Sequence, residues 1–350
     1  MNSQRSNFTF ADLCAGIGGF RLGLESLGGD CVYSCDINTE SEKTYKANYG
    51  EGFDSYDLLA VKEKDLPYAD VLCAGFPCQS FSIAGKNLGF KDERGSIIFK
   101  IASIAREKQP KILFLENVAN LLRQDKGQTF KEICSLLASV GYEVHYQILD
   151  SADFGVPQTR PRIYFVCIRN DIESFGFQFT RKRTKKNPLK NFIQQGDNSI
   201  PISDKWQTYI DLYTGKISVN DVDFILPKTR KKLERIDKGV DLENCIFQIR
   251  SSGIRAISIN NPFPTLAVSI SGGGAMIPVY SGERRHLSIL EMKRIMGFFD
   301  DFDFPVSRTN AIKQLANAVC PPVINSIGKD FLSYLSDSLV VKEVSVPEHV

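Results

Sequence analysis

The sequence lacks the features that mark membrane, secreted and metal-binding proteins. No apolar run in its 350 residues approaches the ~20 residues needed to span a bilayer. The first six residues form no apolar signal core, so we expect the protein to stay in the cytoplasm, away from the membrane. Its nine cysteines form no Cys-x-x-Cys pair, and its three histidines lie far apart. The sequence therefore predicts reduced thiols, no disulfide framework and no metal site.

Net charge is also nearly absent, because 43 Lys and Arg almost balance 41 Asp and Glu. The charges are unevenly distributed, however. Between residues 181 and 256, 16 Lys and Arg stand against 9 Asp and Glu, and the densest runs are 181–186 and 228–232. A basic stretch of this kind indicates either a solvated surface or a region that attracts nucleic-acid phosphates.

Short apolar runs alternate with helical patterns through the first half of the chain. The runs 8–14, 31–35, 71–74, 112–116, 144–149 and 163–168 predict strands, and the stretches 20–27, 39–48, 96–108 and 129–140 predict helices. This alternation predicts an α/β fold with a doubly wound, mainly parallel sheet. No helical stretch separates the last two runs, so we expect the sheet to end in an antiparallel pair.

The pattern changes at about residue 176, where polar, basic and glycine-containing sequence begins and continues to about residue 286. We therefore expect a first domain of residues 1–175, completed by residues 317–350. A second, smaller domain would comprise residues 176–286, and residues 287–316 would form a hinge. The length is sufficient for two domains.

A glycine-rich turn follows the first predicted strand. Gly16, Gly18 and Gly19 stand between that strand and the next helix, where absent side chains let the backbone approach a ligand. Asp36 ends the next strand at a spacing where an acid commonly binds ribose hydroxyls. The turn alone is compatible with any nucleotide-binding enzyme or with tight packing.

A cysteine follows the predicted strand 71–74. Cys78 comes directly after Pro77, and the nearby Gly75 and Pro77 predict a turn at the carboxyl end of the strand, where α/β enzymes keep their chemistry. A thiol in such a turn is a candidate nucleophile. The alternative is a small buried apolar residue, as most free cysteines are.

Five segments together resemble the cytosine-5 DNA methyltransferases, specifically the short bacterial enzymes of type II restriction-modification systems. They are residues 10–20, 74–82, 114–118, 158–166 and 314–319. The resemblance runs from about residue 8 to residue 330. It implies a Rossmann-like S-adenosylmethionine-dependent methyltransferase fold with a smaller DNA-recognition domain. It also implies double-stranded DNA as substrate, a restriction endonuclease as a genetic partner and a monomeric enzyme.

The resemblance assigns the chemistry to four residues. Cys78 would add to carbon 6 of cytosine and so activate carbon 5, by covalent catalysis. Glu116 would donate a proton at ring nitrogen 3, Arg162 would orient Glu116, and Arg160 would contact the base oxygen. Arg160 and Arg162 alternate in a predicted strand, so we expect both to point to one face.

The resemblance also assigns the binding residues. Asp36 would bind the ribose of S-adenosylmethionine, Asp57 its adenine amino group, and Asn317 would close the pocket near the methionine end. The remaining expected cofactor residues are Asp12, Ala15, Gly16, Gly18, Gly19, Ile37, Leu58 and Pro77. Those expected to contact DNA are Ser82, Lys86 and Arg94 after Cys78, and Thr265, Ser271 and Gly272 in the second domain.

The chain departs from the family pattern at two positions. Cys14 stands where the family usually has a phenylalanine that stacks on the cofactor, and Ala316 replaces a usual glycine before Asn317. Three alternatives remain for the whole chain. They are a tRNA cytosine-5 methyltransferase with the same motifs, a DNA-binding regulator without catalysis, and a nicotinamide oxidoreductase, which would explain the glycine turn but none of the later motifs.

Overall fold

The computed structural model describes residues 8–77, 97–174, 176–180, 185–196, 200–231, 233–235, 239–249, 253–267 and 278–335. The chain divides into two compact units. Unit 1 comprises Met1–Asp150, Pro161–Lys182 and Val319–Val350, and unit 2 comprises Ser151–Arg160 and Arg183–Ala318. Residues 287–316, expected to form a hinge, are grouped with unit 2.

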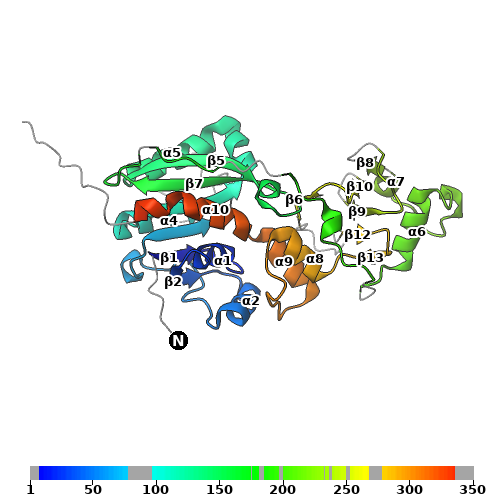
Figure 1. Cartoon of the computed structure of the whole chain (residues 1–350), viewed down its shortest axis with the longest axis horizontal. Helices are drawn as coiled ribbons and strands as arrows, with labels where there is room; N and C mark the ends of the chain where they lie inside the picture. The colour runs from blue at the N-terminus through cyan, green and yellow to red at the C-terminus, as the bar shows by residue number, and fades with distance from the viewer. Residues whose placement is uncertain are drawn as a thin grey trace, which may run out of the picture. The chain divides into compact units, whose positions relative to one another are not determined.

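Unit 1 contains a six-stranded sheet in the order β2-β1-β3-β4-β7-β5 (Figure 1). The strands are β1 (Phe8–Leu13), β2 (Gly29–Cys35), β3 (Val71–Gly75), β4 (Ile112–Val118), β5 (Tyr142–Asp150) and β7 (Pro161–Arg169). β1 pairs in parallel with β2 and β3, and β3 pairs in parallel with β4. β7 lies between β4 and β5 and is antiparallel to both. The predicted mainly parallel sheet and its final antiparallel pair are therefore confirmed.

Helices pack against both faces of this sheet. They are α1 (Gly19–Glu25), α2 (Thr39–Tyr49), α4 (Ile97–Lys108), α5 (Gln128–Ser139) and α10 (Pro321–Phe331), with the 3-10 helices η1 (Glu63–Asp65), η3 (Ala119–Gly127) and η8 (Leu332–Leu335). On one face, the apolar side chains of α4 and α5 join one core cluster with Leu13, Leu115 and Phe165. On the other, the rings of Phe20 in α1 and Phe331 in α10 meet the ring of Phe114 edge-on. Strand residues alternate between the two faces, so both are buried, as a doubly wound fold requires.

Unit 2 contains a five-stranded sheet in the order β13-β12-β9-β10-β8. Its strands are β8 (Leu233–Arg235), β9 (Cys245–Ile249), β10 (Ile254–Ser258), β12 (Val279–Tyr280) and β13 (Arg285–His286). Its helices are α6 (Asp204–Thr214), α7 (Lys228–Lys231), α8 (Ile289–Met296) and α9 (Arg308–Asn317), with η4 (Ser151–Phe154), η5 (Leu189–Asn191) and η6 (Val219–Asp221). Trp206 and Tyr209 of α6 share a core cluster with Phe247 of β9. A separate parallel pair joins β6 (Gln158–Thr159) to β11 (Phe263–Pro264).

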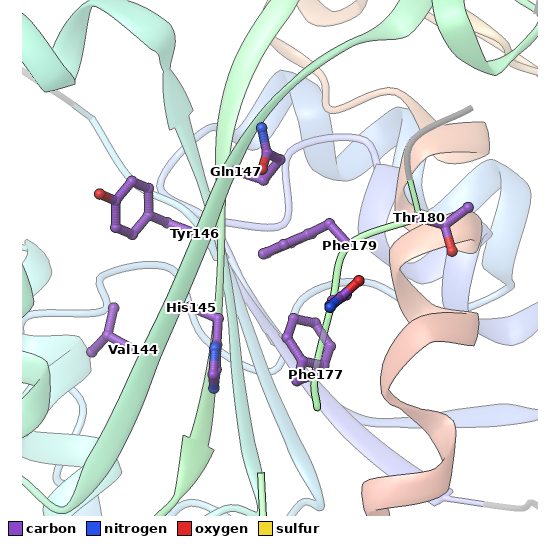
Figure 2. Close-up of a pocket in the computed structure, with 8 residues that line it drawn as sticks. Val144, His145, Tyr146, Gln147, Phe177, Phe179 and Thr180 are labelled. Carbon is purple, nitrogen blue, oxygen red and sulfur yellow. The ribbon is translucent and has the colours of Figure 1, made fainter. Parts of the chain in front are cut away.

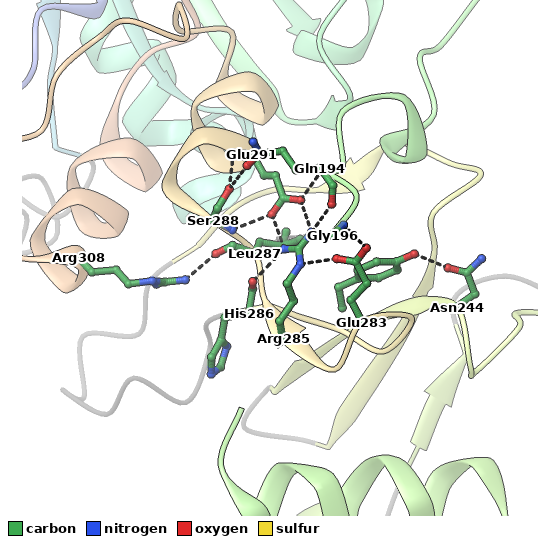
Figure 3. Close-up of polar contacts among 11 residues, drawn as sticks. Gln194, Gly196, Asn244, Glu283, Arg285, His286, Leu287, Ser288, Glu291 and Arg308 are labelled. Carbon is green, nitrogen blue, oxygen red and sulfur yellow. Dashed lines mark hydrogen bonds and ion pairs between the residues drawn. The ribbon is translucent and has the colours of Figure 1, made fainter. Parts of the chain in front are cut away.

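A buried ion pair fixes the start of α8 (Figure 3). Arg285 binds both carboxylate oxygens of Glu291, at 2.8 and 2.9 Å, and both side chains are almost fully buried. Glu291 also completes a capping box with Ser288, which satisfies free backbone donors at the helix start. The pair therefore stabilises the junction of α8 with β13 inside unit 2.

Among the described helices, none is long and apolar enough to cross a bilayer.

Candidate active site

The glycine-rich turn lies between β1 and α1 in unit 1. Gly16 and Gly18 have φ of +58° and +79°, in the left-handed region that favours glycine. The amide of Gly16 donates a hydrogen bond to Asp36 Oδ2 at 2.8 Å. The other carboxylate oxygen of Asp36 accepts a hydrogen bond from the amide of Asn38 at 2.8 Å. The structure therefore brings the turn and the acid together at the carboxyl ends of β1 and β2.

Asp12 and Gly19 are buried around this turn. Asp12 is completely buried in β1, and burial raises the pKa of its carboxyl group to about 8, helped by the nearby charge of Asp36. A fully enclosed carboxyl group does not touch a ligand, so any part that Asp12 plays in binding passes through the turn. A Cβ at Gly19 would lie 2.7 Å from the side chain of Val319, which explains why only glycine fits there.

A cavity of about 500 Å³ lies beyond the edge of β2. Ser55 forms a parallel bridge with Cys35, so Asp57 and Asp36 follow neighbouring extended segments and leave them at the same edge. Asp57 lines the cavity together with Tyr33 and Ser55. Ile37 is 77% exposed, and Leu58 is buried in the core. The cavity itself combines apolar side chains, such as Val61, with the polar Ser55 and Asp57, which is suitable for a heterocyclic ligand.

Glu116 and Arg162 form an ion pair at the end of β4. The distance from Arg162 Nε to Glu116 Oε1 is 3.0 Å, and the two side chains are only 14% and 12% exposed. Glu116 is paired with Gly75 across β3 and β4, and a Cβ at Gly75 would lie 3.6 Å from Glu116 Oε2. The carboxylate is thus held over the end of β3, the strand that leads to Pro77.

The segment after β3 is anchored as far as the description extends. Asn117 Nδ2 donates a hydrogen bond to the carbonyl of Phe76 at 2.9 Å, and Pro77 is exposed. Cys78, Ser82, Lys86 and Arg94 lie outside the described residues. In unit 2, Ser271 and Gly272 do so as well.

Arg160 lies in unit 2, at a break between β6 and β7. The expectation that Arg160 and Arg162 share one continuous strand is wrong, because β6 pairs with β11 whereas β7 begins at Pro161 and pairs with β5. The Arg160 guanidinium donates to the carbonyls of Ala316 and Ala318, both at 2.9 Å, and to that of Leu266 at 3.4 Å. Arg160 therefore holds the carbonyls on both sides of Asn317.

Thr265 belongs to the same group of contacts. Its hydroxyl donates a hydrogen bond to the carbonyl of Thr159 at 2.9 Å. The structure thus brings Arg160, Thr265 and Asn317 together within unit 2, although they lie more than 50 residues apart in sequence, by hydrogen bonds that involve the backbone.

Another cavity, of about 770 Å³, lies along β5 and contains no residue predicted for the site. Figure 2 shows the imidazole of His145 beside the ring of Phe177, with ring centroids 5.1 Å apart. Burial lowers the pKa of His145 below its ordinary value, and the opposing effect of the nearby Glu143 carboxylate is smaller. None of the described residues that line this cavity belongs to the glycine turn or to the Glu116–Arg162 pair, so the candidate site lies at the carboxyl ends of β1 to β4.

Sequence reasoning missed a buried arginine behind the glycine turn. Arg21 in α1 contacts Tyr45 and Tyr49 of α2. The hydrophobic patterns that predict the two helices do not indicate that these three residues meet. The one available signal is a charged residue on the apolar side of the short helix that begins at Gly19.

The fold and the candidate site are typical of α/β enzymes with a doubly wound sheet, which bind nucleotide-like ligands at the carboxyl ends of the parallel strands. Residues 8–333 match the model of a protein family that is described as C-5 cytosine-specific DNA methylase. The chain belongs to this family.

Known relatives match over most of their length. The type II methyltransferase M.HhaI of Haemophilus parahaemolyticus is 36% identical over 335 residues, which cover 96% of this chain and 97% of the relative. The type II methyltransferase M1.ScrFI of Lactococcus lactis subsp. cremoris is 36% identical over 341 residues, covering 96% of this chain and 81% of the relative. The solved structure of the Entamoeba histolytica methyltransferase EhMeth has a TM-score of 0.62 at 20% identity, covers 94% of this chain and 99% of that one, and shares the fold.

The chain is therefore a DNA (cytosine-5-)-methyltransferase, an enzyme that transfers a methyl group from a donor to carbon 5 of cytosine in DNA. A tRNA substrate has less support, because the matching family acts on DNA. The methyltransferase fold expected from the sequence is confirmed.

Proposed function

We propose that the enzyme methylates carbon 5 of a cytosine rotated out of a short, specific duplex site, through a covalent adduct with Cys78. The observation that carries this proposal is the buried Glu116–Arg162 pair beside the end of β3, the strand that leads to Cys78. A carboxyl group and a nucleophile that follow neighbouring strands can act on the same base.

S-adenosylmethionine is the proposed methyl donor, and it supplies an electrophilic methyl group when bound. The residues present fit it. Asp36 lies beside the glycine turn, where it can accept hydrogen bonds from ribose hydroxyls, and Asp57 lines a cavity beyond the same edge, where it can bind an adenine amino group. The backbone of the turn and of Leu58, whose side chain lies in the core, and the side chains of Ile37 and Pro77 would contact the donor, with Asn317 near its methionine end.

The proposed chemistry uses three of the chain's own groups. The Cys78 thiolate attacks carbon 6, and the electron pair displaced from the ring makes carbon 5 nucleophilic. In its protonated form, Glu116 donates a proton at nitrogen 3, so that negative charge does not build up on the ring. After methyl transfer, a base removes the proton from carbon 5, the thiolate leaves carbon 6, and the proton on nitrogen 3 returns to the Glu116 carboxylate. Arg162 holds the Glu116 carboxyl in place through its planar fork.

Arg160 is proposed to contribute to base binding through the segment that it holds, since its donors reach the carbonyls next to Asn317 and Thr265. Its proposed contact with the base oxygen requires a donor directed away from those carbonyls. Asp12, buried in β1 just before the turn, is proposed to stabilise the turn without contacting the donor.

Recognition of DNA is proposed to lie mainly in residues 176–286, with the catalytic work in residues 1–175 and 317–350. Exposed Lys228 and Lys231 in α7 suit phosphate contacts, which position a protein on DNA. Ser82, Lys86, Arg94, Thr265, Ser271 and Gly272 are the residues proposed to contact DNA directly.

The cellular role is proposed from the relatives, which are named type II methyltransferases. We infer that the enzyme acts on cytoplasmic DNA as a monomer. It would protect host DNA from a restriction endonuclease that is a genetic rather than a physical partner.

Bisulfite sequencing of DNA from cells that express the chain tests this proposal. We expect 5-methylcytosine at one cytosine of a short recurring sequence, and none when Cys78→Ser is expressed at the same level, because an alcohol is a far poorer nucleophile than a thiolate. A duplex with 5-fluorocytosine should form a stable adduct with the parent protein and none with Cys78→Ser. Methylation that persists in Cys78→Ser, or that appears in tRNA and not in DNA, would contradict the proposal.

A further inference from the structure

The carbonyl of Gly18 is held by two donors. It accepts the first helical hydrogen bond of α1, from the amide of Leu22 at 2.9 Å. It also accepts a hydrogen bond from the hydroxyl of Tyr49, the last residue of α2, at 2.8 Å. Because Gly18 ends the glycine-rich turn, Tyr49 connects that turn to a second helix.

The ring of Tyr49 also occupies the place of a side chain at residue 18. A Cβ on Gly18 would lie 2.5 Å from Tyr49 Cε2 and 2.6 Å from its hydroxyl oxygen. Glycine with φ of +79° is therefore required for two reasons, the backbone conformation and the ring beside it.

Arg21 also contacts the Tyr49 ring. The guanidinium carbon lies 4.4 Å from the centre of the Tyr49 ring, a distance at which cation and ring attract. The guanidinium is in turn bound by Glu25 at 2.6 Å, by Glu51 at 2.8 Å and by the Tyr45 hydroxyl at 2.9 Å. Burial also raises the pKa of the Tyr49 hydroxyl well above its ordinary value, so the group stays a donor throughout the working pH range.

We propose that Tyr49 is a positioning residue for binding of the methyl donor, because it holds the turn at Gly18 while Asp36 holds it at Gly16. The two attachments act at two different residues of the turn, one through an amide and one through a carbonyl. This inference rests on the proposed donor site. A turn that is already ordered loses less conformational freedom on binding, so its preorganisation increases affinity without changing the chemical step.

Tyr49→Phe tests this role, because it keeps the ring and removes only the hydroxyl. We expect KM for S-adenosylmethionine to rise about three- to tenfold, the range that one neutral hydrogen bond typically supplies. The kcat at saturating donor and the KM for duplex DNA should stay within about twofold of the parent. Calorimetric titration with S-adenosylhomocysteine should show the same loss of affinity as KM.

Tyr45→Phe is the matched control, one turn earlier in the same helix. It removes a hydroxyl from the same network, but Arg21 keeps Glu25 and Glu51, and the turn is not touched. We expect lower thermal stability and an unchanged KM for the donor. Equal effects of the two variants on KM, or a fall in kcat for Tyr49→Phe with KM unchanged, would overturn the positioning role.

Asp36→Ala separates the two levels of the argument. If it weakens donor binding and Tyr49→Phe does not, the donor site stands and the role of Tyr49 is wrong. If Asp36→Ala leaves donor affinity unchanged, the proposed donor site is wrong and the inference fails with it.

Discussion

Glu116→Gln is the substitution that most directly separates a catalytic carboxyl group from a structural one. The Glu116–Arg162 pair is mostly buried, with exposures of 12% and 14% and a distance of 3.0 Å. Removing one partner of a buried pair typically costs about 3–5 kcal/mol of stability, because the other charge is left uncompensated. The Gln amide oxygen can still accept from Arg162, so we expect a smaller loss of about 2 kcal/mol.

The effect on catalysis should be larger than the effect on stability. A positioned proton donor contributes about 10²- to 10⁴-fold to the rate, and an amide cannot donate a proton in its place. We therefore expect kcat to fall about 1,000-fold, equivalent to about 4 kcal/mol in the barrier. The assays are urea denaturation for stability and transfer of labelled methyl groups to duplex DNA for kcat, both at a temperature where each variant is folded.

Glu291→Gln provides the matched control. The Arg285–Glu291 pair has a distance of 2.8 Å and exposures of 2% and 1%, and it lies among residues with no proposed catalytic role. The Glu291→Gln substitution should lower the free energy of unfolding at least as much as Glu116→Gln does, since Arg285 and Glu291 are more fully buried than Arg162 and Glu116. The kcat of the folded control should stay within about threefold of the parent. If Glu116→Gln behaves like this control, losing stability but keeping kcat, the reasoning on Glu116 is refuted.

Three further predictions concern pH, salt and the donor pocket. The pKa of Asp12 is raised to about 8 by burial, so the folded protein retains a proton that the unfolded chain releases above its usual pKa of 3.8. The parent should therefore lose up to about 1.4 kcal/mol of unfolding free energy for each unit that the pH rises from 3.8 to about 8, whereas Asp12→Asn should not. If urea unfolding gives the same difference between the two proteins at pH 5 and at pH 8, this prediction is contradicted. Lys228→Gln with Lys231→Gln should weaken binding to all duplexes alike and reduce the salt slope by about 2, measured by fluorescence anisotropy, since each phosphate contact contributes about 0.9; an unchanged slope would remove these lysines from the DNA surface. Cys14→Phe should tighten the methyl donor by about 1 kcal/mol, because an aromatic ring can stack on the adenine; unchanged affinity in calorimetry would mean that the space is already filled.

The sequence predicted the elements of unit 1 well, because their signals are local. β4 is predicted from the apolar run at 112–116, and the strand extends only two residues further, to Val118. The sheet order was less accessible. The insertion of β7 between β4 and β5 depends on pairing between residues about 50 apart, such as Glu116 with Tyr164, and hydrophobic periodicity does not encode such pairing.

The site shows the same limit more sharply. The spacing of Gly16 and Asp36 predicted two groups that the structure joins by one hydrogen bond. No pattern indicated that Tyr49 would reach the Gly18 carbonyl, because that contact depends on how α2 packs against α1. For Arg160, the sequence predicted a place in the same strand as Arg162, and the break between β6 and β7 made that prediction wrong.

The division of the chain follows from where these contacts fall. The segment 151–160 joins unit 2 because its partners are there: Leu266 donates its amide to Gln158 at 2.8 Å, Phe263 donates to Pro157 at 2.7 Å, and Arg160 holds residues 316 and 318. Each of these bonds has a backbone group on at least one side, so they depend strongly on the path of the chain. Any exchange of recognition segments between relatives therefore has to keep the path of residues 157–160, 263–266 and 316–318 together. Residues 176–286 carry the basic excess, but the contacts that attach their later part, at 263–266, reach residues 157–160 outside that range. The proposed DNA-recognition segment and the contacts that hold it therefore share no single boundary in the sequence.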